Sequence, residues 1–340
     1  MKLLPCATAL ALLAATATAI PAHARDRHFL VVTASNTPAN NLLVYNSSNQ
    51  LIQTLPTGGS GGVSGNAGGI ATSRDRLAVV NFGSQNVSIF KRSDEGFRLA
   101  QVIPTVSSPV SVAFGHGHMY VLGTTSVESH QVFEFGVSAG IDGKSDLLLA
   151  DGSAAQVGVL DDQLILTEKN NVIETVNLGF DGAVHGVASL VGNIPANVNA
   201  PFGLVTRDNE AYVTIAHANE ISLVRQDSVV TVTGSGTQNA PCWLALDGPY
   251  LYSANSPSQS VSRYLVFGTK IVQAKAVAAS FNGNPTDVAY RDGQLGVIDG
   301  AGSVSHLSVF DVDGDGDLTL RNVATINSAA NGVAIVSPEE

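Results

Sequence analysis

One short pattern recurs along almost the whole chain and limits the folds open to it. Each copy has a loop, a strand that opens on Pro or Ala, a tight turn, and a second strand that ends on a polar residue. The copies open at Ala67, Pro109, Ala155, Pro201, Pro241, Pro285 and Ala330, at intervals of 40 to 46 residues. This period, carried by β-branched and aromatic residues between Gly-rich turns, is typical of four-stranded propeller blades.

The two ends of the chain complete the count of blades. Six full copies run from about Ala67 to Ile326, and the last copy supplies one strand before the chain stops. Segments 29–33, 41–45 and 50–55 supply three more strands. Pairing the last strand with these three removes the exposed edges of an open array. The sequence therefore predicts an all-β fold, a seven-bladed β-propeller that forms a single domain over residues 25–340.

The first 24 residues have the features of a secretory signal peptide. Lys2 is followed by a Leu- and Ala-rich run, and Ala22-His23-Ala24 fits a cleavage site. A membrane anchor is the alternative, but Pro5 and several Thr residues interrupt the run and no basic cluster follows it. We therefore expect a secreted protein, extracellular or periplasmic, without a membrane span, and we expect it to be a monomer.

Charge and cysteine content exclude several classes of function. The chain has 17 Lys and Arg against 28 Asp and Glu, a net charge of −11, and no block of basic residues. This balance argues against nucleic acid as a partner. Cys6 lies in the expected signal peptide, which leaves Cys242 alone. A disulfide scaffold and a cysteine-based zinc site are thereby excluded.

The propeller template predicts where functional side chains gather. Residues that precede first strands or follow second strands lie on one face of the disc, around the central channel. The polar residues expected at these positions are Asn81, Glu168, Lys169, His217, Asn255 and Asp299. Glu168 or His217 could act as base or proton donor on a lactone, and Lys169 with the two asparagines could hold a carboxylate. The alternative is that these side chains only bond loop backbone in a water-filled funnel.

Several sequence blocks resemble one known family. They are Ser108–Ala113, Leu166–Lys169, Ala200–Gly203, Asn239–Trp243, Ser260–Tyr264 and Asn284–Ala289, and segment 80–90 is similar as well. Together they resemble the secreted 3-carboxymuconate cyclase-like proteins among the lactonase-type seven-bladed propellers. The resemblance implies action on a small carboxylated lactone or its open form, without a metal or organic cofactor. It also suggests Arg263, in one of these blocks, as a further substrate-binding residue.

A non-catalytic function is the second interpretation. A propeller with few charged residues (13%) and a Gly-rich loop at residues 58–69 could bind an extracellular protein or glycan through the same face. Fold alone does not decide between the two, because propellers host many unrelated functions.

Four other motifs have structural explanations. Asp311, Asp313 and Asp315 match half of a calcium loop, but position twelve is Asn322, so a metal-free hairpin is favoured and calcium is the alternative. His116 and His118 are expected in an exposed turn. Gly58–Gly62 fits a nucleophile-elbow pattern but reads as a flexible loop. Cys242 is expected to be a buried core thiol beside Trp243, since no base is evident near it.

Overall fold

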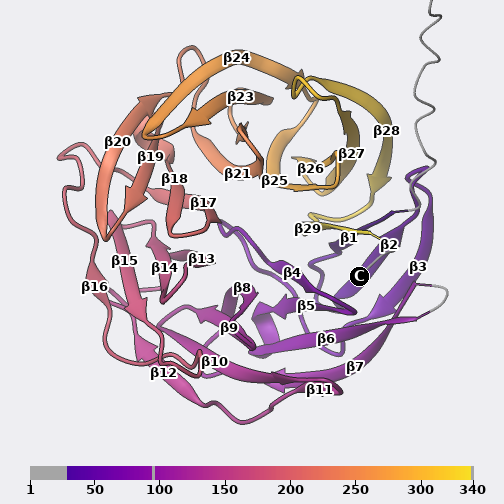
Figure 1. The fold of residues 1–340 in the computed structure, drawn as a ribbon. Helices are drawn as coiled ribbons and strands as arrows, with labels where there is room; N and C mark the ends of the chain where they lie inside the picture. The colour runs from indigo at the N-terminus through magenta and orange to yellow at the C-terminus, as the bar shows by residue number, and fades with distance from the viewer. Residues whose placement is uncertain (1–28, 94–95, 338–340) are drawn as a thin grey trace, which may run out of the picture.

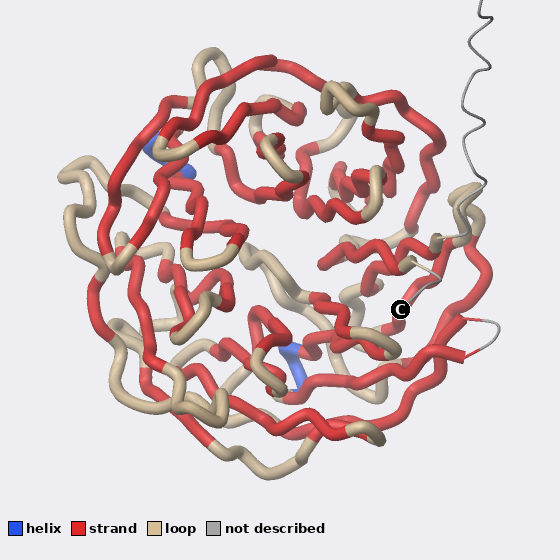
Figure 2. Tube along the Cα trace, in the orientation of Figure 1, coloured by secondary structure: helices blue, strands red, loops and turns tan. Residues whose placement is uncertain are grey.

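The structure, a computed structural model, describes residues 29–93 and 96–337. It confirms the predicted fold: seven sheets are arranged around a central axis, and helix within these described residues is limited to two short 3-10 turns, Phe82–Ser84 and Ala216–Ala218 (Figures 1 and 2). The expected signal peptide lies outside the described residues.

We number the blades along the chain from the first complete one. Blade 1 contains β4 (Ile70–Ser73), β5 (Arg76–Asn81), β6 (Asn86–Ser93) and β7 (Gly96–Pro104). Blade 2 contains β8 (Pro109–Gly115), β9 (His118–Gly123) and β10 (Ser126–Phe133), with β11 (Gly136–Val137) and β12 (Gly143–Asp146) at its outer edge. Blade 3 contains β13 (Ala154–Val159), β14 (Gln163–Glu168), β15 (Val172–Asn177) and β16 (Ser189–Leu190).

The second half of the disc has the same plan. Blade 4 contains β17 (Pro201–Arg207), β18 (Glu210–Ile215), β19 (Glu220–Arg225) and β20 (Ser228–Gly234). Blade 5 contains β21 (Pro241–Asp247), β22 (Tyr250–Asn255), β23 (Ser260–Phe267) and β24 (Lys270–Ser280). Blade 6 contains β25 (Asn284–Arg291), β26 (Gln294–Ala301), β27 (Val304–Val312) and β28 (Leu318–Ile326).

Blade 7 is shared between the two ends of the chain, as predicted. It joins β29 (Asn331–Val336), from the C-terminal end, to β1 (Leu30–Ala34), β2 (Asn41–Tyr45) and β3 (Leu51–Pro56). β29 pairs antiparallel with β1 in the register Val31 to Ile335, and it occupies the innermost position of the blade. In Figure 1 the yellow β29 lies beside the indigo β1.

The inner strands carry a repeated irregularity. The pairing of β8, β13, β17, β21 and β25 with the following strand shifts register two or three residues after the opening Pro or Ala. A β-bulge re-aims the side chain at that point. The residues there include Ser111, Gln156, Trp243 and Asp287, and we call this circle of positions the inner ring.

Inner-ring side chains connect neighbouring blades. Ser111 Oγ accepts the amide N–H of Val157 at 3.3 Å, from blade 2 to blade 3. Gln156 Oε1 accepts that of Leu204 at 2.7 Å, from blade 3 to blade 4. Asp287 Oδ2 accepts that of Val333 at 3.1 Å, from blade 6 to the closing strand. Each bond satisfies a buried strand amide that would otherwise face the interior.

Apolar side chains fill the space between blades outside this ring. One cluster joins Tyr212 and Leu223 of blade 4 to Leu251, Tyr264 and Val266 of blade 5, all buried. Burial of such surface supplies the main favourable term in folding. The polar ring then sets how adjacent first strands lie against each other.

Gly203 occupies the ring position of blade 4, where the blades come closest. A Cβ atom placed there would lie 2.1 Å from the carbonyl oxygen of Cys242 in blade 5. Because the obstacle is backbone, no rotamer change can relieve the contact.

The first prediction concerns this close approach. We expect Gly203→Ala to force blades 4 and 5 apart and to lower the free energy of unfolding by about 2–4 kcal/mol, as overpacked cores do. Chemical denaturation followed by far-UV circular dichroism measures the change. Gly314→Ala is the matched control, because a Cβ at Gly314 meets nothing within 4 Å. A denaturation midpoint of Gly203→Ala equal to that of the control would contradict the assigned contact.

Candidate functional site

Glu168, a predicted catalytic residue, serves as a loop anchor. It ends β14 and is wholly buried. Its two carboxylate oxygens accept the amide N–H groups of Leu149 and Ala150 at 3.0 and 3.2 Å. These two residues belong to the loop that leads into blade 3. Burial raises the pKa of Glu168, but both oxygens are already bonded to the protein's own backbone.

Asn81 and Asn255 occupy equivalent places in blades 1 and 5. Both are buried at the ends of second strands, and each donates through Nδ2 to two side chains of the third strand in its own blade. Asn81 Oδ1 also accepts from Thr57 Oγ1 at 2.8 Å, in the loop before blade 1. Since third strands lie outside second strands, these amides turn away from the channel.

Asp299 has the same kind of role in blade 6. Its Oδ2 accepts the amide N–H of Gly283 at 2.9 Å, and His306 Nδ1 lies 3.2 Å from the same oxygen. Glu168 and Asp299 therefore match the alternative in which strand-end polar groups hold loop backbone, whereas Asn81 and Asn255 bond side chains.

Arg263, the predicted substrate-binding arginine, contacts the Asp-rich hairpin of blade 6. Its guanidinium donates to the carbonyl of Asp315 and to the carboxylate of Asp317, each at 2.5 Å. Lys275 Nζ lies 2.7 Å from the same Asp317 oxygen. Tyr252, on β22, adds a hydroxyl bond of 2.8 Å to the carbonyl of Gly316. The hairpin is therefore docked onto blade 5, and Arg263 lies within that contact.

The calcium alternative does not fit this hairpin. The carboxylate of Asp311 bonds Arg321 and Gln294, while Asp313 Oδ1 accepts the amide N–H groups of Asp315 and Asp317 within the turn. Among the residues that the structure describes, no three His, Cys, Asp or Glu side chains gather as metal ligands would. The carboxylate of Asp311 thus binds side chains of the protein, and that of Asp313 closes the turn.

His116 and His118 have separate partners. His116 is exposed in the turn between β8 and β9, as predicted, and its Nε2 lies 2.7 Å from the carbonyl oxygen of Leu160. His118 is buried instead of exposed, and its Nε2 lies 2.8 Å from Asp142 Oδ2. The correction for His118 follows from strand alternation, which turns its ring into the space between blades.

The Gly-rich loop before blade 1 covers one mouth of the channel. Residues 63–69, which we call the plug, cross the centre of the disc ahead of β4 (Figure 1). Asn66 accepts Trp243 Nε1–H of blade 5 on its carbonyl at 3.0 Å and donates to the carbonyl of Val110 in blade 2 at 2.7 Å. The Asn331 side chain of blade 7 donates to Asn66 Oδ1 at 2.7 Å. The amide of Ala67 donates to the carbonyl of Ala155 in blade 3 at 3.1 Å, so contacts from four blades hold the plug.

A pocket beside the plug contains two of the predicted residues. It measures about 330 Å³ and lies on the face where first strands begin. Its polar lining is Lys169, His217, Asn170, Asn171 and Asn199, and its apolar lining includes Phe202. The structure thus brings Lys169 and His217 together, while Glu168, Asn81, Asn255, Asp299 and Arg263 line no part of this pocket.

Lys169 and His217 offer different chemistry within this pocket. Lys169 Nζ donates to the carbonyls of Gly65 and Ala154 at 2.7 and 3.2 Å, which leaves one N–H of the ammonium for a ligand. Burial lowers the pKa of this amine. His217 is exposed in the 3-10 turn Ala216–Ala218. In the described part of the chain its imidazole makes no hydrogen bond, so both ring nitrogens face solvent or ligand.

Cys242 also lines the pocket, but its chemistry is that of a core thiol. Burial raises the pKa of this thiol to about 12. The thiolate is the nucleophilic form. Cys242 is therefore unreactive near neutral pH.

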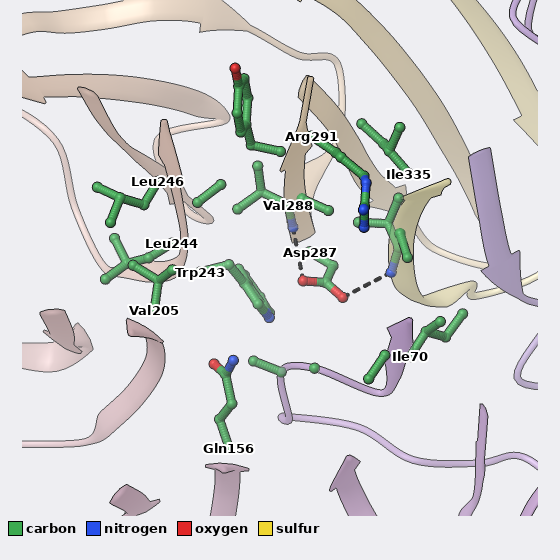
Figure 3. A pocket seen from close by; sticks show the side chains of 18 of the residues that line it. Ile70, Gln156, Val205, Trp243, Leu244, Leu246, Asp287, Val288, Arg291 and Ile335 are labelled. Carbon is green, nitrogen blue, oxygen red and sulfur yellow. Dashed lines mark hydrogen bonds between the residues drawn. The ribbon is translucent and has the colours of Figure 1, made fainter. Parts of the chain in front are cut away.

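Below the plug, the channel forms a separate cavity that sequence reasoning missed. It measures about 270 Å³ and is lined by the inner strands of six blades, including Gln156, Trp243 and Asp287 (Figure 3). Asp287 is buried, and burial raises its pKa to about 7. The available signal was an ionisable residue, Asp287, two residues after the proline that opens a first strand beside the channel.

Comparison with known proteins supports the architecture. No protein-family model matches the chain, and no curated protein matches its sequence. Among solved structures, a provisionally named 6-phosphogluconolactonase from Bacteroides fragilis superposes with a TM-score of 0.68 at 14% identity, over 92% of this chain and 99% of that one. A periplasmic gluconolactonase from Pseudomonas aeruginosa gives 0.66 at 12% identity, over 92% and 99%. The chain has the fold of the lactonase-type propellers.

A third solved structure has the same fold, and its function is unknown. A functionally unknown protein from Desulfotomaculum acetoxidans gives a TM-score of 0.68 at 14% identity, over 92% of this chain and 99% of that one. At such identities the lactonase-type fold is shared, and activity has to be argued from the site. No helix in the described residues is long and apolar enough to cross a membrane.

Blade 3 also buries a second carboxyl group close to Glu168. Glu174 on β15 is wholly buried and accepts the amide N–H of Leu148 at 3.0 Å through Oε2, while Oε1 has no partner among the described residues. Burial, and then the negative charge of Glu168, raise its pKa to about 7 from an ordinary 4.5. The folded state therefore binds the proton more tightly than the unfolded chain does.

The second prediction concerns the pH dependence of stability that proton binding by Glu174 produces. Between about pH 4.5 and pH 7 the folded state holds more protons, so the free energy of unfolding falls as pH rises. We expect Glu174→Gln to reduce this loss of unfolding free energy by roughly 1–3 kcal/mol. The variant should then be more stable than wild type at pH 8. Denaturant midpoints from pH 5 to pH 8 measure it, with exposed Glu134→Gln as control. Parallel pH profiles for Glu174→Gln and wild type would contradict the assignment.

Proposed function

We propose that this protein opens a small carboxylated lactone in the pocket beside the plug. The observation that carries the proposal is that Lys169 and His217, from different blades, line one pocket with three asparagine side chains. The shared lactonase-type fold and the resemblance to 3-carboxymuconate cyclase-like proteins support the same substrate class. With the expected signal peptide, the protein would act outside the cytoplasm.

The residues have complementary roles in this proposal. Lys169 binds the substrate carboxylate through its remaining ammonium N–H. His217 takes a proton from water as the water oxygen bonds to the lactone carbonyl carbon. The ring carbon–oxygen bond then breaks, and the proton passes from the imidazole to the leaving oxygen. The asparagine amides stand on the pocket wall as donors for the carbonyl oxygen.

Binding without turnover is the second candidate function. The position of Glu168 favours this candidate. Both of its carboxylate oxygens accept loop amides, so it does not take part in the pocket. Catalysis would then depend on His217 as the acid–base group. With binding alone, the same pocket would retain a small carboxylate, or part of an extracellular protein or glycan.

The third prediction separates the two candidates. With a panel of carboxylated lactones followed by pH-stat titration, His217→Ala should lower kcat by 10²- to 10⁴-fold, as loss of a general base does. Lys169→Met should raise KM by roughly 10- to 100-fold with a smaller change in kcat, because a charge-assisted bond is lost. His185→Ala and Lys144→Met, exposed residues elsewhere on the disc, are the controls.

Two results would decide against catalysis. Wild-type protein that hydrolyses no lactone but binds the corresponding hydroxy acids, with affinity reduced in Lys169→Met, would establish the binding function. Hydrolysis that is equal in wild type and His217→Ala would remove the proposed base.

A further inference from the structure

The channel cavity is covered by the plug at one end and accessible from the other. At the end covered by the plug, Trp243 Nε1–H donates to the carbonyl of Asn66 at 3.0 Å, and Ala67 and Gly68 of the plug line the cavity. Further along the same strands, Val205, Leu246 and Tyr290 are partly exposed, near the hairpins of the opposite face. The cavity therefore opens on the face opposite to the Lys169–His217 pocket.

Asp287 accepts two backbone amides, that of Val288 on Oδ1 at 2.8 Å and that of Val333 on Oδ2 at 3.1 Å (Figure 3), and the bond to Val333 between blades does not require its negative charge. In the inner ring, Ser111 and Gln156 accept a neighbouring strand amide just as Asp287 accepts that of Val333. A neutral acceptor is thus sufficient at this position in two other blades. What an aspartate adds is the capacity for negative charge inside the channel, where burial opposes that charge.

The groups around Asp287 match an organic cation. The side chains of Trp243 and Gln156 lie on the same cavity as the carboxyl group (Figure 3). An indole face attracts cations through its quadrupole, and the remaining wall is largely aliphatic. Gln156 Nε2 has no hydrogen-bond acceptor among the described residues, so it can donate to an oxygen of a ligand.

The other charged groups lie at the outer end of the cavity. Arg291 and Tyr290 are the further titratable residues of its lining, both from β25, and the five other lining strands contribute none. Asp292 Oδ2 lies 3.7 Å from Arg291 Nε, and Asp247 bonds the hydroxyl of Tyr290. Two acidic side chains, Asp292 and Asp247, thus lie beside Arg291 and Tyr290 at the opening.

We propose that the channel cavity is a second ligand site, which takes a small organic cation whose ammonium group contacts Asp287 and whose apolar body lies against Trp243. The cation enters from the face opposite to the plug. The site is independent of the lactone pocket, because the two share no lining residue. A cation at this point also favours the charged form of a carboxyl group whose pKa burial raises to about 7.

The fourth prediction uses benzylammonium chloride as the probe and the uncharged benzyl alcohol as its matched control. Trp243 is the single tryptophan of the chain, so its fluorescence reports binding directly, and calorimetry checks the one-to-one ratio. We expect saturable binding of benzylammonium at pH 8 and at least tenfold weaker binding of benzyl alcohol. Affinity should fall as pH drops below 7, since Asp287 then takes up a proton.

Two variants remove the negative charge and supply one neutral oxygen in place of the two that accept the amides of Val288 and Val333. Asp287→Ser and Asp287→Gln place there the side chains that Ser111 and Gln156 provide elsewhere in the ring, and each should weaken benzylammonium binding at least tenfold. Lys169→Met should leave this binding unchanged. Equal affinity for the two probes, undiminished binding in a folded Asp287 variant, or no binding by wild type would each overturn the proposal. If neither variant folds, pH-independent binding by wild type would do so.

Discussion

The disc is held together by hydrogen bonds that pass from one first strand to the next around the axis. A blade alone satisfies its strand amides within its own sheet, but the bulge near the start of the first strand in blades 2 to 6 goes with amides directed at the neighbouring blade. Ser111, Gln156 and Asp287 accept these amides, and Gly203 allows the backbones of blades 4 and 5 to touch. The closing strand β29 is bonded in the same way, because the amide N–H of Val333 donates to Asp287. Apolar burial between blades supplies the larger energy, while the ring sets the geometry.

The same geometry determines where ligands can bind. The plug is fixed over the channel by bonds to blades 2, 3, 5 and 7. Two of the spaces near the axis are a pocket beside the plug, with Lys169 and His217, and the channel below it, with Asp287. Both contain groups whose pKa is shifted by burial, which is common at functional sites.

The sequence predicted the architecture well because the repeat is a property of the whole chain. The predicted openings of the first strands fall within three residues of the observed ones, the largest difference being Ala67 against Ile70. Side-chain direction was harder to predict. Consecutive strand residues face opposite ways, so an error of one residue at a strand end reverses the predicted direction. Asn81 and Asn255, the last residues of second strands, bond side chains of third strands, whereas Lys169 and His217, just beyond strand ends, reach the pocket. The plug was missed because its contacts come from blades far away in sequence.

Amide hydrogen exchange at Leu204 tests the role of the inner ring most directly. This amide donates to Gln156 Oε1 across the boundary between blades 3 and 4. If the ring holds neighbouring blades together, Gln156→Ala should speed exchange at Leu204 at least tenfold, while amides within the blade 6 sheet keep their wild-type rates. Unchanged protection of Leu204 in a folded Gln156→Ala variant would show that apolar packing alone sets the arrangement of the blades.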